Sequence, residues 1–191
     1  MNKGIKQIFR AMPVLYTKRL ILRKMEKGDY RDMYDYAKSP TLTKYLTWEP
    51  HPDEGYTAKY LSYIQSKYRQ GEFFDWAVIY NGKMIGTCGF TAIDEYNLCG
   101  EIGYVISEKY QNCGFATEAV LKVLDFGFSS LSLHRIEARH MDGNSASRRV
   151  MEKAGMTYEG TLRESLYVKG KYVSVAICSI TKNEYYEKNS V

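Results

Sequence analysis

The hydrophobic pattern changes its period within one stretch of the chain, residues 101–128. Ile102, Tyr104 and Ile106 alternate with smaller or polar residues, which predicts a buried strand. From residue 116 to residue 131, apolar side chains recur at helical spacing, which predicts a helix with one broad apolar face. We therefore expect a strand, a tight turn and a helix here, with the rest of the fold organised around them.

Patterns of the same two kinds continue on both sides of this unit. Asn81-Gly82 lies between two alternating stretches and strongly favours a hairpin. The strand after the central helix completes a strand–helix–strand order, which favours parallel pairing. Residues 41–56 follow neither pattern and are predicted to be irregular. The other predicted elements are a strand at 16–25, helices at 29–38 and 57–69, strands at 73–80, 83–93, 98–107 and 134–140, a helix at 145–154, and a closing hairpin at 156–168 and 172–180.

These elements predict an α/β fold with a mixed, mostly antiparallel sheet. With 191 residues, the chain has room for one domain with a sizeable core. We expect that domain at residues 16–191, preceded by an N-terminal extension at residues 1–15.

Composition and charge narrow the classes of function. The net charge of +5 suits a polyanionic ligand, but Lys and Arg are scattered, so direct nucleic-acid binding is not expected. The 4 cysteines and 3 histidines show no metal-ligand spacing, so no metal is expected. Charged residues interrupt the apolar positions of residues 1–13, so neither a membrane segment nor an export signal is expected. The protein is predicted to be cytoplasmic.

The turn before the central helix reads Gln111-Asn112-Cys113-Gly114-Phe115-Ala116. Backbone N–H groups at the start of a helix are unpaired and lie at the positive end of the helix dipole, so this turn can bind a pyrophosphate. A glycine that only supplies a positive φ in an ordinary turn would leave the same pattern. Neither G-x-G-x-x-G nor G-x-x-x-x-G-K-[ST] occurs here, which disfavours a Rossmann site and a nucleotide P-loop.

This turn resembles the acyl-CoA signature of the GNAT superfamily of N-acetyltransferases, Gln/Arg-x-x-Gly-x-Gly/Ala, at Gln111, Gly114 and Ala116. Other segments are similar to the RimJ/RimL-like branch of that superfamily, the ribosomal-protein N-terminal acetyltransferases. Together they cover most of the chain from residue 16 onward. In chain order these segments are Thr17-Lys18-Arg19-Leu20-Ile21-Leu22-Arg23, Glu101-Ile102-Gly103-Tyr104, Arg135-Ile136-Glu137-Ala138, Asn144-Ser145-Ala146-Ser147 with Lys153-Ala154-Gly155-Met156, and Glu159-Gly160 with Arg163.

The resemblance implies a GNAT fold of about seven strands flanked by helices, in which a splayed parallel pair at the centre receives the pantetheine of acetyl-CoA. It places Trp48 in the region that covers the acceptor, where a purely structural role is the alternative. Asn144 is expected at the pantetheine, although a helix N-cap would also explain it. The residues expected to bind acetyl-CoA are Tyr104, Val105 and Ile106 at the pantetheine, Gln111, Asn112, Cys113, Gly114, Phe115, Ala116 and Thr117 at the pyrophosphate, and Asn144 and Ser147 from the next helix.

Acetyl transfer to an amine needs a neutral nucleophile, a polarised thioester and a proton for the leaving thiolate. Glu101 is the candidate base and acceptor contact, because it is an isolated carboxylate at the start of the central strand. A cross-strand partner for a cation is its structural alternative. Met151 stands where the commoner GNAT helix carries a tyrosine, and a thioether cannot donate a proton. Ser147, one turn earlier, is therefore the candidate acid, and a helix-start residue is its alternative.

The predicted function is transfer of an acetyl group from acetyl-CoA to a primary amine by direct attack in a ternary complex. An α-amino group has a pKa of about 7.7–8.0 and is partly neutral near pH 7, unlike a lysine at about 10.4. A protein N-terminus, such as that of a ribosomal protein, is therefore the preferred acceptor. The alternatives are a polyamine, an aminoglycoside or another antibiotic, and a non-catalytic acyl-CoA sensor. A monomer or a homodimer is expected.

Overall fold

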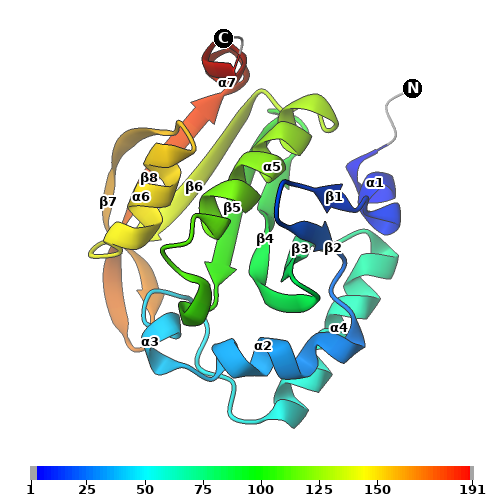
Figure 1. The fold of residues 1–191 in the computed structure, drawn as a ribbon. Helices are drawn as coiled ribbons and strands as arrows, with labels where there is room; N and C mark the ends of the chain where they lie inside the picture. Colours follow the sequence, from blue (N-terminus) through cyan, green and yellow to red (C-terminus); the bar gives the residue numbers. More distant parts are fainter. Residues whose placement is uncertain (1–3, 190–191) are drawn as a thin grey trace. The chain divides into compact units, whose positions relative to one another are not determined.

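The computed structural model describes residues 4–189, which form helices and one eight-stranded sheet (Figure 1). The strands are β1 (Leu15–Tyr16), β2 (Ile21–Arg23), β3 (Phe74–Tyr80), β4 (Lys83–Asp94), β5 (Cys99–Ile106), β6 (Arg135–Met141), β7 (Thr157–Val168) and β8 (Lys171–Thr181). The helices are α1 (Ile5–Ala11), α2 (Tyr30–Ala37), α3 (Pro40–Thr43), α4 (Glu54–Gln70), α5 (Phe115–Ser129), α6 (Ser145–Lys153) and α7 (Lys182–Asn189), with short 3-10 turns η1 (Lys27–Asp29) and η2 (Glu108–Tyr110).

The sheet has the order β1-β2-β3-β4-β5-β6-β8-β7. β5 and β6 are parallel, whereas β1 and β2, β2 and β3, β6 and β8, and β7 and β8 are antiparallel. The prediction of an α/β fold with a mixed, mostly antiparallel sheet is confirmed. Within residues 4–189, no helix is long and apolar enough to cross a membrane.

The first predicted strand, at residues 16–25, is wrong in detail because the chain turns back within it. The N–H of Thr17 donates to the carbonyl of Leu20 at 3.0 Å, and the Thr17 hydroxyl accepts the N–H of Leu20 at 2.8 Å. This turn separates β1 from β2, which pair with each other, so the sheet has one strand more than expected.

The stretch at 41–56 is less irregular than predicted. The Ser39 hydroxyl accepts the N–H of Leu42, and Pro40 occupies the first turn of α3, so the Ser-Pro pair starts a helix as well as ending α2. At the other end, the carboxylate of Asp53 caps α4 by accepting the N–H of Tyr56 at 2.7 Å. α7 at the C-terminal end was not predicted.

The residues divide into two compact units, and the first contains the chain up to Gly89 together with Tyr104–Lys122. In this unit α1 packs on β3. The ring of Phe9 lies 4.6 Å from that of Phe74 and 5.6 Å from that of Trp76, and Trp76 Nε1 donates to the carbonyl of Pro13 at 2.9 Å. Much of the expected N-terminal extension therefore docks against this unit, while residues 1–3 lie outside the described part of the chain.

The second unit contains Phe90–Gly103 and the chain from Val123 onward. Its core lies under the second half of α5, where Val123, Leu124 and Phe128 are buried. A Cβ at Gly127 would lie 2.6 Å from Ile136 Cδ1, so only glycine lets this helix approach β6 so closely.

β7 is the terminal strand of the sheet and pairs with β8 on one side only. Its pairing register shifts twice, between Tyr158 and Gly160 and between Leu162 and Leu166. Glu164, inside the second irregularity, has a φ of 49°. The pairing of β7 with β8 is therefore interrupted at two places.

Candidate active site

The turn that leads into α5 lies in the first unit and has the geometry of an anion-binding loop. Asn112 and Gly114 both have positive φ values, 60° and 81°. The N–H of Glu118 donates to the Gly114 carbonyl at 3.0 Å, so the N–H groups of the preceding helical residues have no acceptor within the helix. A Cβ added at Gly114 would approach only Arg19 Nη2, at 3.4 Å, so the backbone is open at this point. The loop fits a pyrophosphate group.

Arg19 holds this loop in place, a role that no pattern in the sequence indicates. Its Nη1 donates to the carbonyl of Cys113 at 3.0 Å, and its Nε pairs with Glu118 Oε2 at 2.7 Å. The guanidinium carbon also lies 4.4 Å from the ring centroid of Phe115. One side chain therefore contacts the loop, the first residue of α5 and the first turn of that helix.

Glu118 is the centre of this network. Its Oε1 accepts the Thr17 hydroxyl at 2.6 Å and the Arg19 N–H at 2.9 Å. Burial opposes ionisation, but the hydrogen bonds from Thr17 and Arg19 and the Arg19 charge outweigh it and lower the pKa of Glu118. Arg19 belongs to the segment on which the family resemblance rests, yet only its strand was predicted, because a contact across the fold leaves no local pattern.

The predicted loop residues differ in exposure. Gln111, Asn112, Cys113 and Gly114 are exposed, Ala116 and Thr117 are half-buried, and Phe115 is buried. Gln111 Nε2 donates back to the carbonyl of Ile106 at 3.1 Å, which ties the loop to the end of β5. Phe115 can therefore offer a ligand its backbone N–H, whereas its ring packs against Tyr80 at 4.6 Å.

The parallel pair of β5 and β6 is short. Paired residues run from Cys99 with Arg135 to Ile102 with Ala138, while β5 continues to Ile106. Tyr104 and Val105, on that continuation, are half-buried, and Ile106 is buried.

Glu101 lies within the parallel pair, in the second unit. The Thr91 hydroxyl donates to its Oε1 at 2.9 Å, and Arg139 Nε lies 3.1 Å from its Oε2. Arg139 also contacts Glu137 at 2.8 Å, so the guanidinium bridges two carboxylates. The cross-strand cation is therefore present, and the Glu101 side chain keeps 28% of its exposure.

α6 places the other two predicted residues, also in the second unit. The Asn144 side chain accepts the N–H of Ser147 at 3.1 Å, so Asn144 is the N-cap, as predicted. Ser147 is half-buried. Met151, at the expected tyrosine position, is only 1% exposed.

Trp48 is half-buried and belongs to an aromatic group in the first unit. Its ring lies 5.4 Å from that of His51, which in turn lies 4.8 Å from Tyr56 and 5.8 Å from Tyr60. His51 is buried, its Nδ1 lies 2.8 Å from the Thr57 hydroxyl, and burial lowers its pKa. We call Trp48, His51, Tyr56 and Tyr60 the aromatic group.

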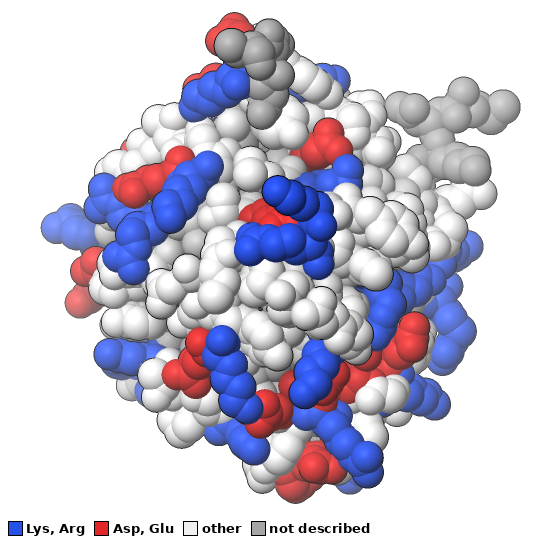
Figure 2. Space-filling view, viewed as in Figure 1, with Lys and Arg blue, Asp and Glu red and all other residues white. Residues whose placement is uncertain are grey.

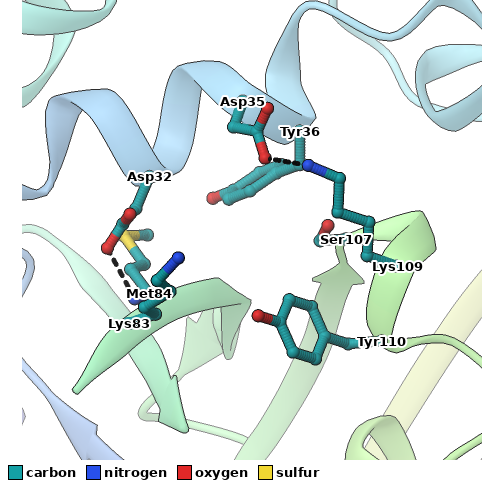
Figure 3. Close-up of a pocket in the computed structure, with 8 residues that line it drawn as sticks. All are labelled: Asp32, Asp35, Tyr36, Lys83, Met84, Ser107, Lys109 and Tyr110. Carbon is teal, nitrogen blue, oxygen red and sulfur yellow. Dashed lines mark hydrogen bonds and ion pairs between the residues drawn. The ribbon is translucent and has the colours of Figure 1, made fainter. Parts of the chain in front are cut away.

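A pocket opens in the first unit between α2, the start of β4 and the end of β5 (Figure 3). Lys109 Nζ pairs with Asp35 at 2.6 Å across it, and the Met84 N–H donates to Asp32 Oδ2 at 3.0 Å. The hydrogen bond from Lys109 lowers the pKa of Asp35. The lining residues are Asp32, Asp35, Tyr36, Lys83, Met84, Ser107, Lys109 and Tyr110.

Charges of both signs occur on the face of the molecule drawn in Figure 2. Figure 2 shows basic and acidic side chains interspersed on the face drawn, without one continuous basic area. Among the described residues, no group of three or more His, Cys, Asp and Glu side chains has a metal-binding arrangement.

Comparison with known proteins agrees with this geometry. Residues 19–157 match the acetyltransferase (GNAT) domain. The chain is 37% identical over 176 residues to the uncharacterized N-acetyltransferase p20 of Bacillus licheniformis, covering 91% of this chain and 99% of that protein. It is 24% identical over 172 residues to the spermidine N(1)-acetyltransferase of Vibrio cholerae, covering 89% of this chain and 97% of that enzyme.

The fold also matches a solved structure of RimL, the ribosomal L7/L12 alpha-N-protein acetyltransferase in complex with coenzyme A. The TM-score is 0.77 at 19% identity, covering 88% of this chain and 98% of that one. At this identity the similarity is one of fold. The GNAT match includes Arg19, the loop before α5, Glu101 and the start of α6, and the chain belongs to the GNAT family of acetyl-CoA-dependent N-acetyltransferases.

Proposed function

We propose that this enzyme acetylates the N-terminal α-amine of a protein, with acetyl-CoA as the acetyl donor. The observation that carries the cofactor assignment is the loop before α5, held by Arg19 and Glu118. Its positive φ values, open backbone at Gly114 and helix N-terminus together suit a pyrophosphate. The side chains of Arg19 and Glu118 hold the loop in shape. The backbone N–H groups of the loop would donate hydrogen bonds to the pyrophosphate.

Acetyl-CoA supplies an activated thioester, and an acceptor that arrives as an ammonium ion first loses one proton to become the neutral nucleophile. Its attack forms the amide bond as the carbon–sulfur bond breaks, and the second proton of the amine ends on the CoA thiolate. A backbone N–H of residues 104–106 would polarise the thioester carbonyl. The proton lost by the ammonium ion would pass to Glu101, directly or through water. Arg139 and Thr91 hold the Glu101 carboxylate in place, which favours a fixed acceptor of that proton.

Ser147 would donate a hydrogen bond to the departing thiolate. The backbone N–H of Ser147 donates to the Asn144 side chain. This cap fixes the backbone of the residue that carries the hydroxyl. A thiol has a pKa of about 8.5, so hydrogen-bond assistance is enough for departure near neutral pH. The proposal therefore needs no stronger acid on α6.

The acceptor assignment rests on acid–base chemistry. A protein N-terminus with a pKa of about 7.7–8.0 gives a useful fraction of neutral amine near pH 7, so one modest base is sufficient. A small amine is the second candidate, because a relative that aligns over 89% of this chain is a spermidine N(1)-acetyltransferase.

The test is CoA release with a panel of amines at equal concentration. It would contain N-terminal peptides of ribosomal proteins, the same peptides with an acetylated N-terminus, spermidine and an aminoglycoside. We expect the free peptides to give the highest kcat/KM and the acetylated peptides to give none. Highest kcat/KM for spermidine or the aminoglycoside would replace the protein acceptor by a small amine. CoA binding without transfer to any amine would favour an acyl-CoA sensor.

A further inference from the structure

Two buried polar atoms of the first unit have no hydrogen-bond partner in the described structure, Asp75 Oδ1 and the Tyr36 hydroxyl. Tyr36 is only 5% exposed. Burial and the negative charge of Asp75 raise the pKa of the Tyr36 phenol, so the two groups lie within electrostatic reach of each other. Buried polar groups are nearly always paired, so two unpaired atoms that are coupled in this way call for an explanation.

The Asp75 carboxyl is on β3 and has no countercharge. It receives hydrogen bonds from the Thr87 hydroxyl and the Trp76 backbone N–H, and burial raises its pKa to about 7. Among the described residues, no cation acts on its pKa. The titratable groups that sense its charge are Tyr36 on α2, Tyr60 and Tyr68 on α4, and Cys88 on β4.

The residues of this cluster are not all fully buried. Asp75 and Tyr60 both keep partial exposure, although Asp75 Oδ1 itself is buried. Tyr36 also lines the pocket between α2 and β4, where its ring lies beside Asp35 and its hydroxyl points inward (Figure 3). A Cβ at Gly89 would lie 2.8 Å from Asp75 Oδ1, so the glycine leaves room for the carboxyl.

We propose that Asp75 and Tyr36 bind the ammonium group of the acceptor amine, an inference that rests on the proposed acetyltransferase function. An ammonium group has three N–H donors and one positive charge. It would give Asp75 Oδ1 a donor and the carboxylate a countercharge, and the Tyr36 oxygen would accept a second hydrogen bond. A bound water would leave the charge uncompensated, and an anion would face a carboxylate with no cation beside it.

Tyr60 is a member of the aromatic group, and its ring lies 5.8 Å from that of His51. Burial and the charge of Asp75 raise the pKa of Tyr60, so the carboxyl lies within electrostatic reach of the aromatic group. Aromatic faces attract cations as well as aliphatic chains. The acceptor is therefore a molecule that enters as a primary ammonium on an aliphatic or peptide chain.

The first experiment compares Asp75→Asn and Tyr36→Phe with Asp94→Asn, a carboxylate control in an exposed turn. Asp94 accepts the N–H of Tyr96 at 2.9 Å at the end of β4 and has no assigned part in the reaction. We expect the KM for a free N-terminal peptide or spermidine to rise roughly tenfold or more in Asp75→Asn and several-fold in Tyr36→Phe. The KM for acetyl-CoA should change less than about twofold, and the control should match the parent.

The outcomes separate the two proposals. A parent protein that acetylates no amine overturns the proposed function and this inference with it. A parent protein that acetylates amines while both variants keep its amine KM overturns only the inference. Thermal unfolding checks the fold, and a structural role for either group would lower the midpoint instead of raising the amine KM alone.

The second experiment measures binding directly, by calorimetry at pH 6 on the complex with CoA. The probes are a peptide with a free N-terminus and the same peptide acetylated. Ammonium binding should ionise the partly protonated Asp75 and release protons, so the enthalpy should depend on the ionisation enthalpy of the buffer. The dependence should vanish in Asp75→Asn and with the acetylated peptide. Equal proton release from the parent and Asp75→Asn would refute the assignment, and His51, which lies in the aromatic group, would be the alternative source.

Discussion

Arg19 and Glu118 lie 99 residues apart in the sequence and form an ion pair of 2.7 Å at the start of α5. Because Arg19 also donates to the carbonyl of Cys113, the pair sets the shape of the loop as well as its charge. Glu118 neutralises the guanidinium, so we expect the loop to bind a ligand through its backbone N–H groups and not through a free arginine. The contact links the first strands of the chain to the proposed cofactor site.

We predict that Arg19→Ala raises the KM for acetyl-CoA roughly tenfold and leaves the KM for the amine nearly unchanged. Without the guanidinium, the Cys113 carbonyl loses its donor and Glu118 keeps a partly buried, less compensated charge. Steady-state kinetics with each substrate varied in turn measures both constants. Arg148→Ala is the control, because it removes only an exposed ion pair with Glu152 on one helix, and it should match the parent. Arg139→Ala is unsuitable as a control because the Arg139 side chain contacts Glu101. Equal KM values in parent and Arg19→Ala would make the pair merely structural.

Gly114→Val should weaken CoA binding about tenfold or more, since a branched side chain is strained at a φ of 81° and crowds the open backbone. Gly170→Val is the matched control, because Gly170 has a φ of 77° in the last hairpin and no atom within 4 Å of a built Cβ. Calorimetry with CoA distinguishes the two. If Gly114→Val binds CoA as tightly as the parent, and both variants lose the same stability, Gly114 is an ordinary turn residue.

Glu101→Gln should lower turnover roughly a hundredfold near pH 6.5, with the deficit shrinking as pH rises and more amine is neutral by itself. The amide keeps an acceptor for the Thr91 hydroxyl, so the fold and the KM for acetyl-CoA should be preserved. A pH–rate profile of parent and variant measures this trend. A deficit that is constant over the whole pH range would assign Glu101 to its ion pair with Arg139 and not to proton transfer.

Ser147→Ala should slow turnover while affinity for CoA falls less, because the hydroxyl assists departure of the thiolate more than it holds the cofactor. The N-cap survives, since Asn144 accepts the backbone N–H of residue 147 and not its hydroxyl. Ser145→Ala, at an exposed position of the same first turn, is the control. Parent-like turnover at saturating acetyl-CoA would reduce Ser147 to a helix-start residue.

Asp75→Asn should stabilise the protein at pH 8 and not at pH 4. The carboxyl of an unfolded chain has a pKa of about 3.9, and burial raises that of Asp75 to about 7. The stability associated with the protonated form is complete below pH 4 and is lost as pH rises through 7. The difference is on the order of 4 kcal/mol, an upper value because Asp75 keeps partial exposure. Urea unfolding at both pH values measures it, and parallel changes with pH in the two proteins would contradict the shift.

The regular elements could be predicted because their signals are local. Asn81-Gly82 marks the hairpin between β3 and β4, and Asn144 marks the start of α6. The turn at Thr17 was missed, because a strand that doubles back after two residues keeps the apolar alternation of a single strand. α3 was missed for a similar reason, since one helical turn is too short to show a period.

The site was only partly predictable. The loop before α5 has a family signature, and an isolated carboxylate such as Glu101 suggests a base or a partner for a cation. No sequence pattern indicates that Arg139 is that cation. Asp75 carries no signal at all, because an aspartate in a strand gives no indication of what it faces. Only the fold reveals that Thr87 forms a hydrogen bond with its carboxyl and that, within residues 4–189, no cation lowers its pKa.

The two register shifts in β7 have a consequence for the behaviour of the protein at high concentration. A 12-residue terminal strand offers a row of backbone donors and acceptors on which another chain could add a strand. The irregularities at 158–160 and 162–166 break that row into short pieces and twist it locally. The interrupted strand thus hinders stacking of folded molecules, edge upon edge, into insoluble ribbons.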